Sequence, residues 1–143
     1  MQLTIQAITT HLDAIDDALS QLTERMADLT EPMLGIGMLL ETSISERIRD
    51  SKQSPDAEDW ADVKGKERDQ ILIGLGMQGG LLSGITSVED SHSVIAGSDK
   101  FYAQFLQMGT RRMVARPFLG ISSQDEQDIA DMLLDEWLGG SLD

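Results

Sequence analysis

The residues that most suggest chemistry are Gly74-Leu75-Gly76-Met77-Gln78-Gly79, which satisfy the G-x-G-x-x-G pattern of dinucleotide-binding loops. Such a loop needs a buried strand before it, a helix after it and an acidic residue about 20 positions further on to bind the ribose. Here only Ile71-Leu72-Ile73 precede the pattern, more glycine follows it, and Asp99 lies in a predicted turn. The sequence therefore favours a flexible joint between a helix and a strand over nucleotide binding.

Other residue types that serve catalysis occur without the spacing that catalysis needs. His11 and His92 are far apart and have no second ligand at metal-binding spacing. Paired catalytic acids need differing environments, whereas the acidic clusters lie on charge-rich faces that we expect to be solvated. No serine lies in a G-x-S-x-G elbow. We expect no catalytic, metal or cofactor site, and no enzyme; the groups considered are Asp16-Asp17, Asp125-Glu126-Asp128, Ser83, Ser87 and Ser122.

Composition narrows the class of protein further. A chain of 143 residues is one ordinary domain by length, and the absence of cysteine excludes disulfides and thiolate metal sites. The net charge of -14 argues against binding nucleic acid through its phosphates. No apolar stretch approaches the roughly 20 residues that span a bilayer, and the start of the chain shows no secretory signal. We expect a soluble protein that binds no membrane.

The segment from Phe101 to Gly120 concentrates aromatic residues, turn-forming residues and arginines. It predicts a helix over 100–108 that stops at Gly109, then an extended arm in which 113–115 can form an edge strand, then a bend at Arg116-Pro117. Proline fixes its own backbone angle and restricts the residue before it. We therefore expect the bend to present Phe118 and Leu119 for docking, with burial of Phe118 in the core as the alternative.

Charge is distributed unevenly around this bend. Three arginines precede it or lie in it, while residues 121–143 contain seven acidic residues and no lysine or arginine. Two explanations remain open: head-to-tail contact between identical subunits, or a solvated helix with pairing inside one chain. The candidate interface residues are Arg111, Arg112, Arg116, Pro117, Phe118 and Leu119.

The elements that must position this segment begin with two helices. Apolar residues alternate at spacings of three and four from Ile5 to Leu29, which predicts a long helix with a heptad seam. A second apolar stripe runs through residues 33–48, after Thr30 and Pro32. We expect the two helices to form an intrachain hairpin over 1–50, which we favour over an intermolecular coil. The seam residues are Ile5, Ile8, Leu12, Ile15, Leu19, Leu22, Met26 and Leu29.

The rest of the chain predicts an α+β domain. Residues 51–70 are polar and read as an exposed loop that Trp60 fixes to the body, with a short helix near Lys66. Alternation over 82–88 and 91–97 predicts two antiparallel strands that turn at Glu89-Asp90. A last acidic helix begins at Ser122 or Ser123, where a serine cap with a carboxylate three residues on is available. It should bury Ile129, Leu133, Leu134 and Trp137 and end at Gly139-Gly140. The small sheet and the helices thus occupy 71–143.

The last third of the chain resembles the phage virion morphogenesis proteins, the tail-completion group of tailed bacteriophages. The resemblance lies in Tyr102-Ala103, Gln107-x-Gly109 and Ala115-Arg116-Pro117-Phe118-Leu119-Gly120, with weaker similarity at Gly80–Ile85 and at Pro55–Trp60. The chain differs from the family pattern at Leu106, where a histidine is common, and at Ala57, where a glycine is common. The family-motif residues to which the resemblance gives a structural role are Trp60, Tyr102, Gln107, Gly109 and Gly120.

The resemblance implies a structural virion protein of the phage neck or tail, made in the host bacterial cytoplasm. It would complete or terminate the tail and join it to the head as a ring, with six copies matching the usual symmetry of the tail tube. The implied partners are further copies of the chain, the tail tube protein and the head-tail connector proteins. DNA would only pass through an acidic channel that repels its phosphates. The alternative is a small acidic adaptor that binds a partner through its N-terminal heptad helix.

Overall fold

The computed structural model describes the backbone of residues 2–73 and 80–138, and the side chains of 12–73 and 80–135. Its helices are α1 (Gln2–Ala27), α2 (Thr30–Glu46), α3 (Ala103–Met108) and α4 (Ser123–Met132). Strands β1 (Ile85–Glu89) and β2 (Val94–Ser98) pair antiparallel, with Val88 opposite Ile95. Two π-helical segments follow α2 and α4, at Arg47–Ser51 and Leu133–Leu138. Two short 3-10 helices lie at Arg68–Gln70 and Leu82–Gly84. The predicted α+β class with a small antiparallel sheet is confirmed.

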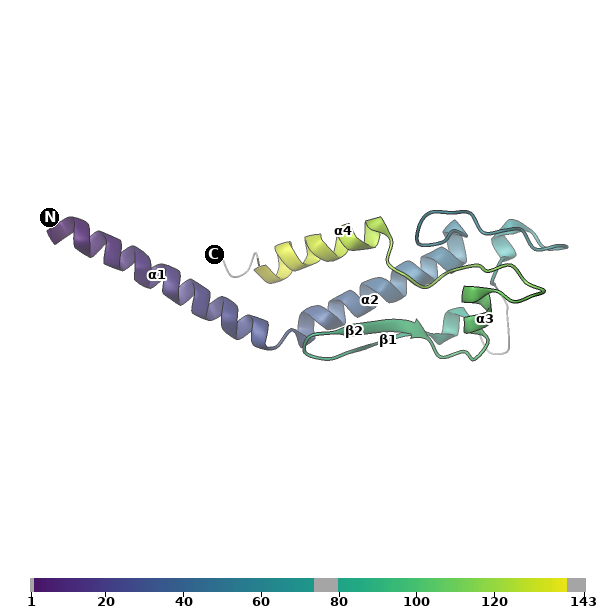
Figure 1. The fold of residues 1–143 in the computed structure, drawn as a ribbon, viewed down its shortest axis with the longest axis horizontal. Coiled ribbons are helices and arrows are strands. Elements are labelled where there is room, and N and C mark those ends of the chain that lie inside the picture. Colours follow the sequence, from purple (N-terminus) through teal and green to yellow (C-terminus); the bar gives the residue numbers. More distant parts are fainter. Residues whose placement is uncertain (1, 74–79, 139–143) are drawn as a thin grey trace.

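Helix α2 is the centre of the body. The β hairpin lies along one side of it and α4 along the other (Figure 1). Its buried residues Ile36, Leu40 and Ile44 recur every four positions, which places them on one helical face. Gly37 allows the close approach to β1, because a Cβ there would lie only 2.6 Å from the Ser87 Oγ atom.

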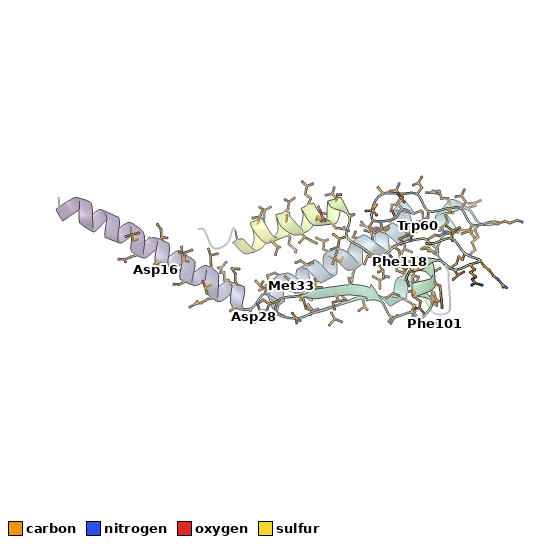
Figure 2. All side chains as sticks on the ribbon, viewed as in Figure 1. Asp16, Asp28, Met33, Trp60, Phe101 and Phe118 are labelled. Carbon is orange, nitrogen blue, oxygen red and sulfur yellow. The ribbon has the colours of Figure 1, made fainter. Side chains whose placement is uncertain are left out.

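The hydrophobic core gathers at the end of α2 that is distant from α1. Phe118, Ile48 and Ile71 are fully buried there, and Trp60 is almost so. Trp60 therefore fixes the loop to the body as predicted (Figure 2). Phe118 belongs to this core, so the expectation that it is presented for docking is wrong.

Helix α1 forms as the heptad spacing predicts, but it does not fold back on α2. It projects away from the body (Figure 1), and every side chain from Leu12 to Gln21 is exposed. The expected burial of its seam in an intrachain hairpin is therefore wrong. The apolar face of α2 is occupied by the β hairpin instead, since α2 packs against both β1 and β2.

Several local predictions hold and others need correction. The helix α3 ends at Gly109, whose φ of 75° is the conformation that glycine favours. The strand predicted over 113–115 does not form, and residues 82–84 are a helical turn rather than the start of β1. Ser122 caps α4 and Asp125 completes the capping box. Leu134 is exposed, against expectation, whereas Ile129 and Leu133 are half-buried; the Trp137 side chain and Gly139-Gly140 lie outside the described residues.

Candidate functional site

The bend at Arg116-Pro117 is anchored in the body. The Arg116 guanidinium is buried and donates hydrogen bonds to the carbonyl oxygens of Ala61 and Asp62, at 2.9 and 3.0 Å. The Trp60 indole N–H donates to the Pro117 carbonyl at 2.8 Å. These contacts satisfy backbone groups of two loops that lack strand partners. Arg116 and Phe118 thus hold the bend in place and offer no exposed docking surface, which corrects the sequence prediction.

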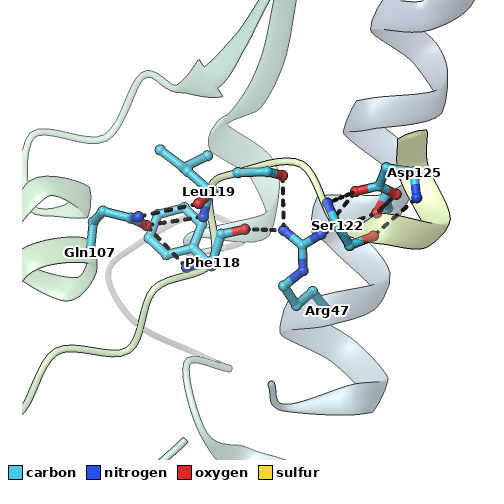
Figure 3. A network of polar contacts seen from close by, with 8 residues as sticks. Arg47, Gln107, Phe118, Leu119, Ser122 and Asp125 are labelled. Carbon is cyan, nitrogen blue, oxygen red and sulfur yellow. Dashed lines mark hydrogen bonds and ion pairs between the residues drawn. The ribbon is translucent and has the colours of Figure 1, made fainter. Parts of the chain in front are cut away.

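Gln107 fixes the residues after the bend from α3. Its Oε1 atom accepts hydrogen bonds from the backbone N–H groups of Phe118 and Leu119, both at 3.0 Å, and its Nε2 donates to the Leu119 carbonyl at 3.2 Å (Figure 3). The side-chain amide therefore forms the hydrogen bonds with this backbone segment that a neighbouring strand would otherwise form. The structure thus gives Gln107 a physical role, and the neutral amide is needed because only an amide both donates and accepts here.

Arg47, at the end of α2, approaches the same segment from the opposite side (Figure 3). Its Nη1 donates to the Phe118 carbonyl at 2.6 Å, and its Nη2 lies 3.1 Å from Asp125 Oδ2 in a buried ion pair. Asp125 also accepts hydrogen bonds from the Ser43 hydroxyl and from the Ser122 backbone N–H. One network therefore joins α2, the segment after the bend and the first turn of α4. Nothing in the sequence pattern linked Arg47 to this site.

The network also determines the ionisation of Asp125. Burial alone would raise the pKa of this carboxyl, but the hydrogen bonds from Ser122 and Ser43 and the charge of Arg47 outweigh it and lower the pKa below its ordinary value. Burial lowers the pKa of Arg47, and Asp125 opposes that effect. Because an arginine stays protonated in proteins, the pair is ionised at neutral pH. Its oxygen and nitrogen atoms already have partners, so we assign it a structural role.

Two further family-motif residues, Gly120 and Tyr102, and one residue outside the motif also have defined contacts. Gly120 has a φ of 140°, and a Cβ there would lie 2.8 Å from the Pro55 side chain, so only glycine fits. Tyr102 is half-buried and packs edge-on against Phe101, with ring centroids 5.5 Å apart. Lys52, which the sequence did not single out, is buried and donates to the Ile71 carbonyl at 3.0 Å.

Four basic side chains are exposed around the anchored bend, together with the carboxylate of Asp62. Arg111 and Arg112 lie on its outer turn and are exposed, and Arg112 borders a pocket of 310 Å³ together with Lys64 and Lys66. Among the ion pairs within residues 12–73 and 80–135, none involves these four side chains. We call Lys64, Lys66, Arg111 and Arg112 the basic end. The sequence pointed to the arginines but not to the lysines, because the loop that contains them is distant in sequence.

The outer side of α4 carries the opposite charge. Asp125 turns inward to Arg47, whereas Glu126, Asp128, Asp131 and Asp135 are exposed. From its first turn α4 runs back along α2, away from the loops that carry the basic end (Figure 1). The intrachain pairing between the bend arginines and α4 that the sequence left open does not form among the described residues. Asp128, Asp131 and Asp135 share one side of the helix, and we call these three carboxylates the acidic face.

The remaining chemical candidates do not form a site. His92 is exposed near the hairpin tip and contacts the Met26 carbonyl at 3.3 Å. No metal-binding cluster of histidine and acidic side chains occurs in the described part of the chain. The glycine pattern at 74–79 lies outside the described residues. Helices long and apolar enough to cross a bilayer are absent from the same described part.

These features define a class of protein: a small α+β protein whose buried polar groups fix chain segments in place. The model of the phage virion morphogenesis family matches residues 10–138. The chain belongs to that family and is a virion morphogenesis protein. Neither the search of curated proteins nor that of solved structures gives a match.

Proposed function

We propose that this chain completes the phage tail at the neck and joins it to the head, as a ring of identical subunits. The observation that carries the proposal is the separation of the basic end from the acidic face. Both are exposed, and neither is neutralised by the other within the chain. Contact between the basic end of one copy and the acidic face of the next is a heterologous contact, which closes into a ring when the rotation between copies allows it.

The anchored bend supports this role. A surface that must bind the same partner repeatedly benefits from a fixed backbone, because less conformational entropy is then lost on binding. Arg116, Gln107 and Trp60 hold the bend, while Arg111 and Arg112 extend from its outer turn. The family motif residues thus build the support, and the interface itself is made by residues beside the motif.

The net charge of -14 fits a conduit through which DNA passes without binding. We expect the lumen of the ring to be acidic, with the tail tube protein and the head-tail connector proteins on its two sides. Six copies would match the symmetry of the tail tube. The role needs no catalysis and no cofactor, and it places the protein in the virion after synthesis in the host cytoplasm.

The proposed contact is tested by exchanging its charges. Arg111→Glu/Arg112→Glu should weaken self-association by about tenfold or more, because like charges then face each other. Adding Asp128→Lys/Asp131→Lys should restore it. The control is Arg49→Glu, which reverses an exposed charge that is not part of the proposed contact. Light scattering over a salt series measures the mass of the assembly, and restoration by the second pair of changes is the decisive result.

The role in the virion is tested separately by genetic complementation. A phage that lacks this chain should produce heads and tails that stay apart in electron micrographs, and the wild-type chain should restore joined particles. The Arg111→Glu/Arg112→Glu variant should fail to do so. Joined, infectious particles in the complete absence of the chain would refute the proposed function.

A further inference from the structure

The heptad seam of α1 is an apolar surface that the described part of the chain leaves uncovered. Leu12, Ile15, Leu19 and Met26 are between 55 and 59% exposed, and only Leu22 is half-buried among the seam residues within α1 whose side chains are described. A helix of 26 residues with this composition gains most of its stability from packing. A protein that keeps such a stripe therefore has a partner for it.

Among the described residues, no part of the body covers this stripe. The face of α2 that the sequence matched to α1 is covered by the β hairpin. The start of α2 also fixes the base of α1: Asp28 accepts a hydrogen bond from the Thr30 backbone N–H at 3.0 Å, and the Leu29 N–H donates to the Ser91 carbonyl at 2.9 Å. These contacts hold the joint against the hairpin tip while α1 points outward (Figure 1).

We propose that the α1 seam binds the α1 seam of a second copy of this chain, as a parallel coiled coil. A seam with strictly alternating spacings of three and four fits best against a seam of the same period. Between Leu12 and Leu29, Asp16 is the only acidic residue that borders the seam; Asp13, Asp17 and Glu24 lie on the outer positions of the heptad. Identical helices therefore approach each other without placing their acidic residues face to face.

Another surface of a neighbouring copy fits less well. A groove of 960 Å³ lies between α2, the loop at 53–57 and the start of α4, and it is lined by Glu46, Asp50, Asp56 and Asp128. The apolar stripe of α1 would bury these carboxylates without a partner, which is unfavourable. A second α1, with its apolar stripe, gives the better match.

Leu12 and Ile15 also bear on the number of helices. With Leu12 at heptad position a and Ile15 at position d, the pairing is the one that favours more than two strands in parallel coiled coils. The parallel direction places each seam residue beside the same residue of the partner, which the test below uses. The seam contact itself is independent of the charge contact at the basic end.

The test uses the absence of cysteine from the 143 residues of the chain. Leu19→Cys places one thiol at the middle of the seam, and Asp17→Cys places one on the outer face of the same helix. Under mild oxidation the Leu19→Cys chain should form disulfide-linked dimers about tenfold faster than the Asp17→Cys chain, since a parallel pair brings seam positions within disulfide reach. Equal rates for the two variants would overturn the inference.

A second measurement needs no cysteine. Leu12→Ser/Leu19→Ser should lower the mass measured by light scattering, while Asp13→Ser/Asp17→Ser should not. Both leucines are exposed in the single chain, so the body should keep its melting temperature. An unchanged mass, or a wild-type chain that stays monomeric at every concentration and salt, would overturn self-association and leave a helix of another protein as the partner.

The crosslinking test of the α1 seam can fail or succeed independently of the proposed role in the tail. Arg111→Glu/Arg112→Glu added to Leu19→Cys should leave the crosslinking rate unchanged. If crosslinking is absent but joined particles still depend on the chain, the seam inference fails and the tail role stands. If crosslinking occurs but particles join without the chain, the tail role fails and the seam contact stands.

Discussion

Replacing Arg47 with methionine should lower the free energy of unfolding by about 3–5 kcal/mol, the usual cost of removing one partner of a buried ion pair. Arg47 and Asp125 are only 5 and 3% exposed, so water cannot replace the lost contact. The change leaves the Asp125 carboxylate without its cation and the Phe118 carbonyl without its donor at 2.6 Å. A loss of this size is a large part of the stability of an ordinary domain.

Asp125→Asn added to Arg47→Met should recover part of that loss. The asparagine carries no charge to bury, and its side-chain oxygen can still accept the Ser122 N–H bond that now measures 2.9 Å. The double variant should therefore be more stable than Arg47→Met alone. The assay is urea unfolding monitored by circular dichroism. The urea concentrations at the unfolding midpoint are compared between variants whose dependence of free energy on urea concentration has the same slope.

The control is Arg49→Met, two residues further on and exposed, which should change stability by less than about 0.5 kcal/mol. The reasoning is refuted if Arg47→Met costs no more than Arg49→Met. It is also refuted if Asp125→Asn lowers the stability of Arg47→Met by as much as it lowers that of the wild type, because the two residues would then be uncoupled.

The same pair predicts a pH dependence. The pKa of Asp125 is lower in the folded chain than its ordinary value of 3.8, so its stabilising effect is complete above that value and is lost as the pH falls through the folded pKa. Arg47→Met loses the part of this contribution that comes from the charge of Arg47. The difference in stability between the wild type and Arg47→Met should therefore narrow below about pH 4. A difference that stays constant from pH 7 to pH 3 would contradict the assignment.

Three further changes test the anchored bend. Phe118→Ala should cost about 3–5 kcal/mol by leaving a core cavity, whereas Phe101→Ala, at a side chain that is 81% exposed, should cost less than about 0.5 kcal/mol in the same urea assay. Gln107→Leu should cost about 1–3 kcal/mol for each backbone N–H left without an acceptor, and Gln107→Glu should cost less because it keeps the acceptor. Gly109→Ala should lower the melting temperature, because its Cβ would lie 2.8 Å from the Ala115 backbone nitrogen at a φ of 75°; an unchanged melting temperature would contradict this strain.

The sequence was informative wherever the signal was local. The heptad spacing predicts α1, the alternation over 82–97 predicts the β hairpin, and Ser122 with Asp125 marks the start of α4. Each of these signals lies within a few residues of the element that it predicts. Propensity and capping act over that range, which explains their success.

The errors concern what covers an apolar surface. The apolar stripe of α2 must be buried against another element, and α1 was the nearest amphipathic helix in the sequence. The hairpin supplies the cover instead, although its inward residues include Ser87, whose hydroxyl donates to Glu41 at 2.6 Å. A half-buried polar residue that has its own hydrogen-bond partner is not detected by a pattern based on hydrophobicity.

The site was half-predicted for a similar reason. Proline and glycine marked the bend, and the exposed arginines of its outer turn were identified. Its support, however, comes from Arg47, which is separated from Phe118 by 71 positions. Such a contact depends on the whole fold and leaves no trace in local spacing. The burial of Phe118 follows from that support, so it could not be decided from the sequence.

The joint between α1 and α2 has a mechanical consequence. A helix of 26 residues is about 39 Å long at 1.5 Å per residue, so a tilt of about 10° at its base moves the far end by about 7 Å. The base is set by a few contacts, among them the Leu29 N–H bond to Ser91 and the Thr30 N–H bond to Asp28. A small shift in these two hydrogen bonds therefore produces a large displacement at the far end of α1. The contacts at the tip of the β hairpin thus determine the direction in which α1 points.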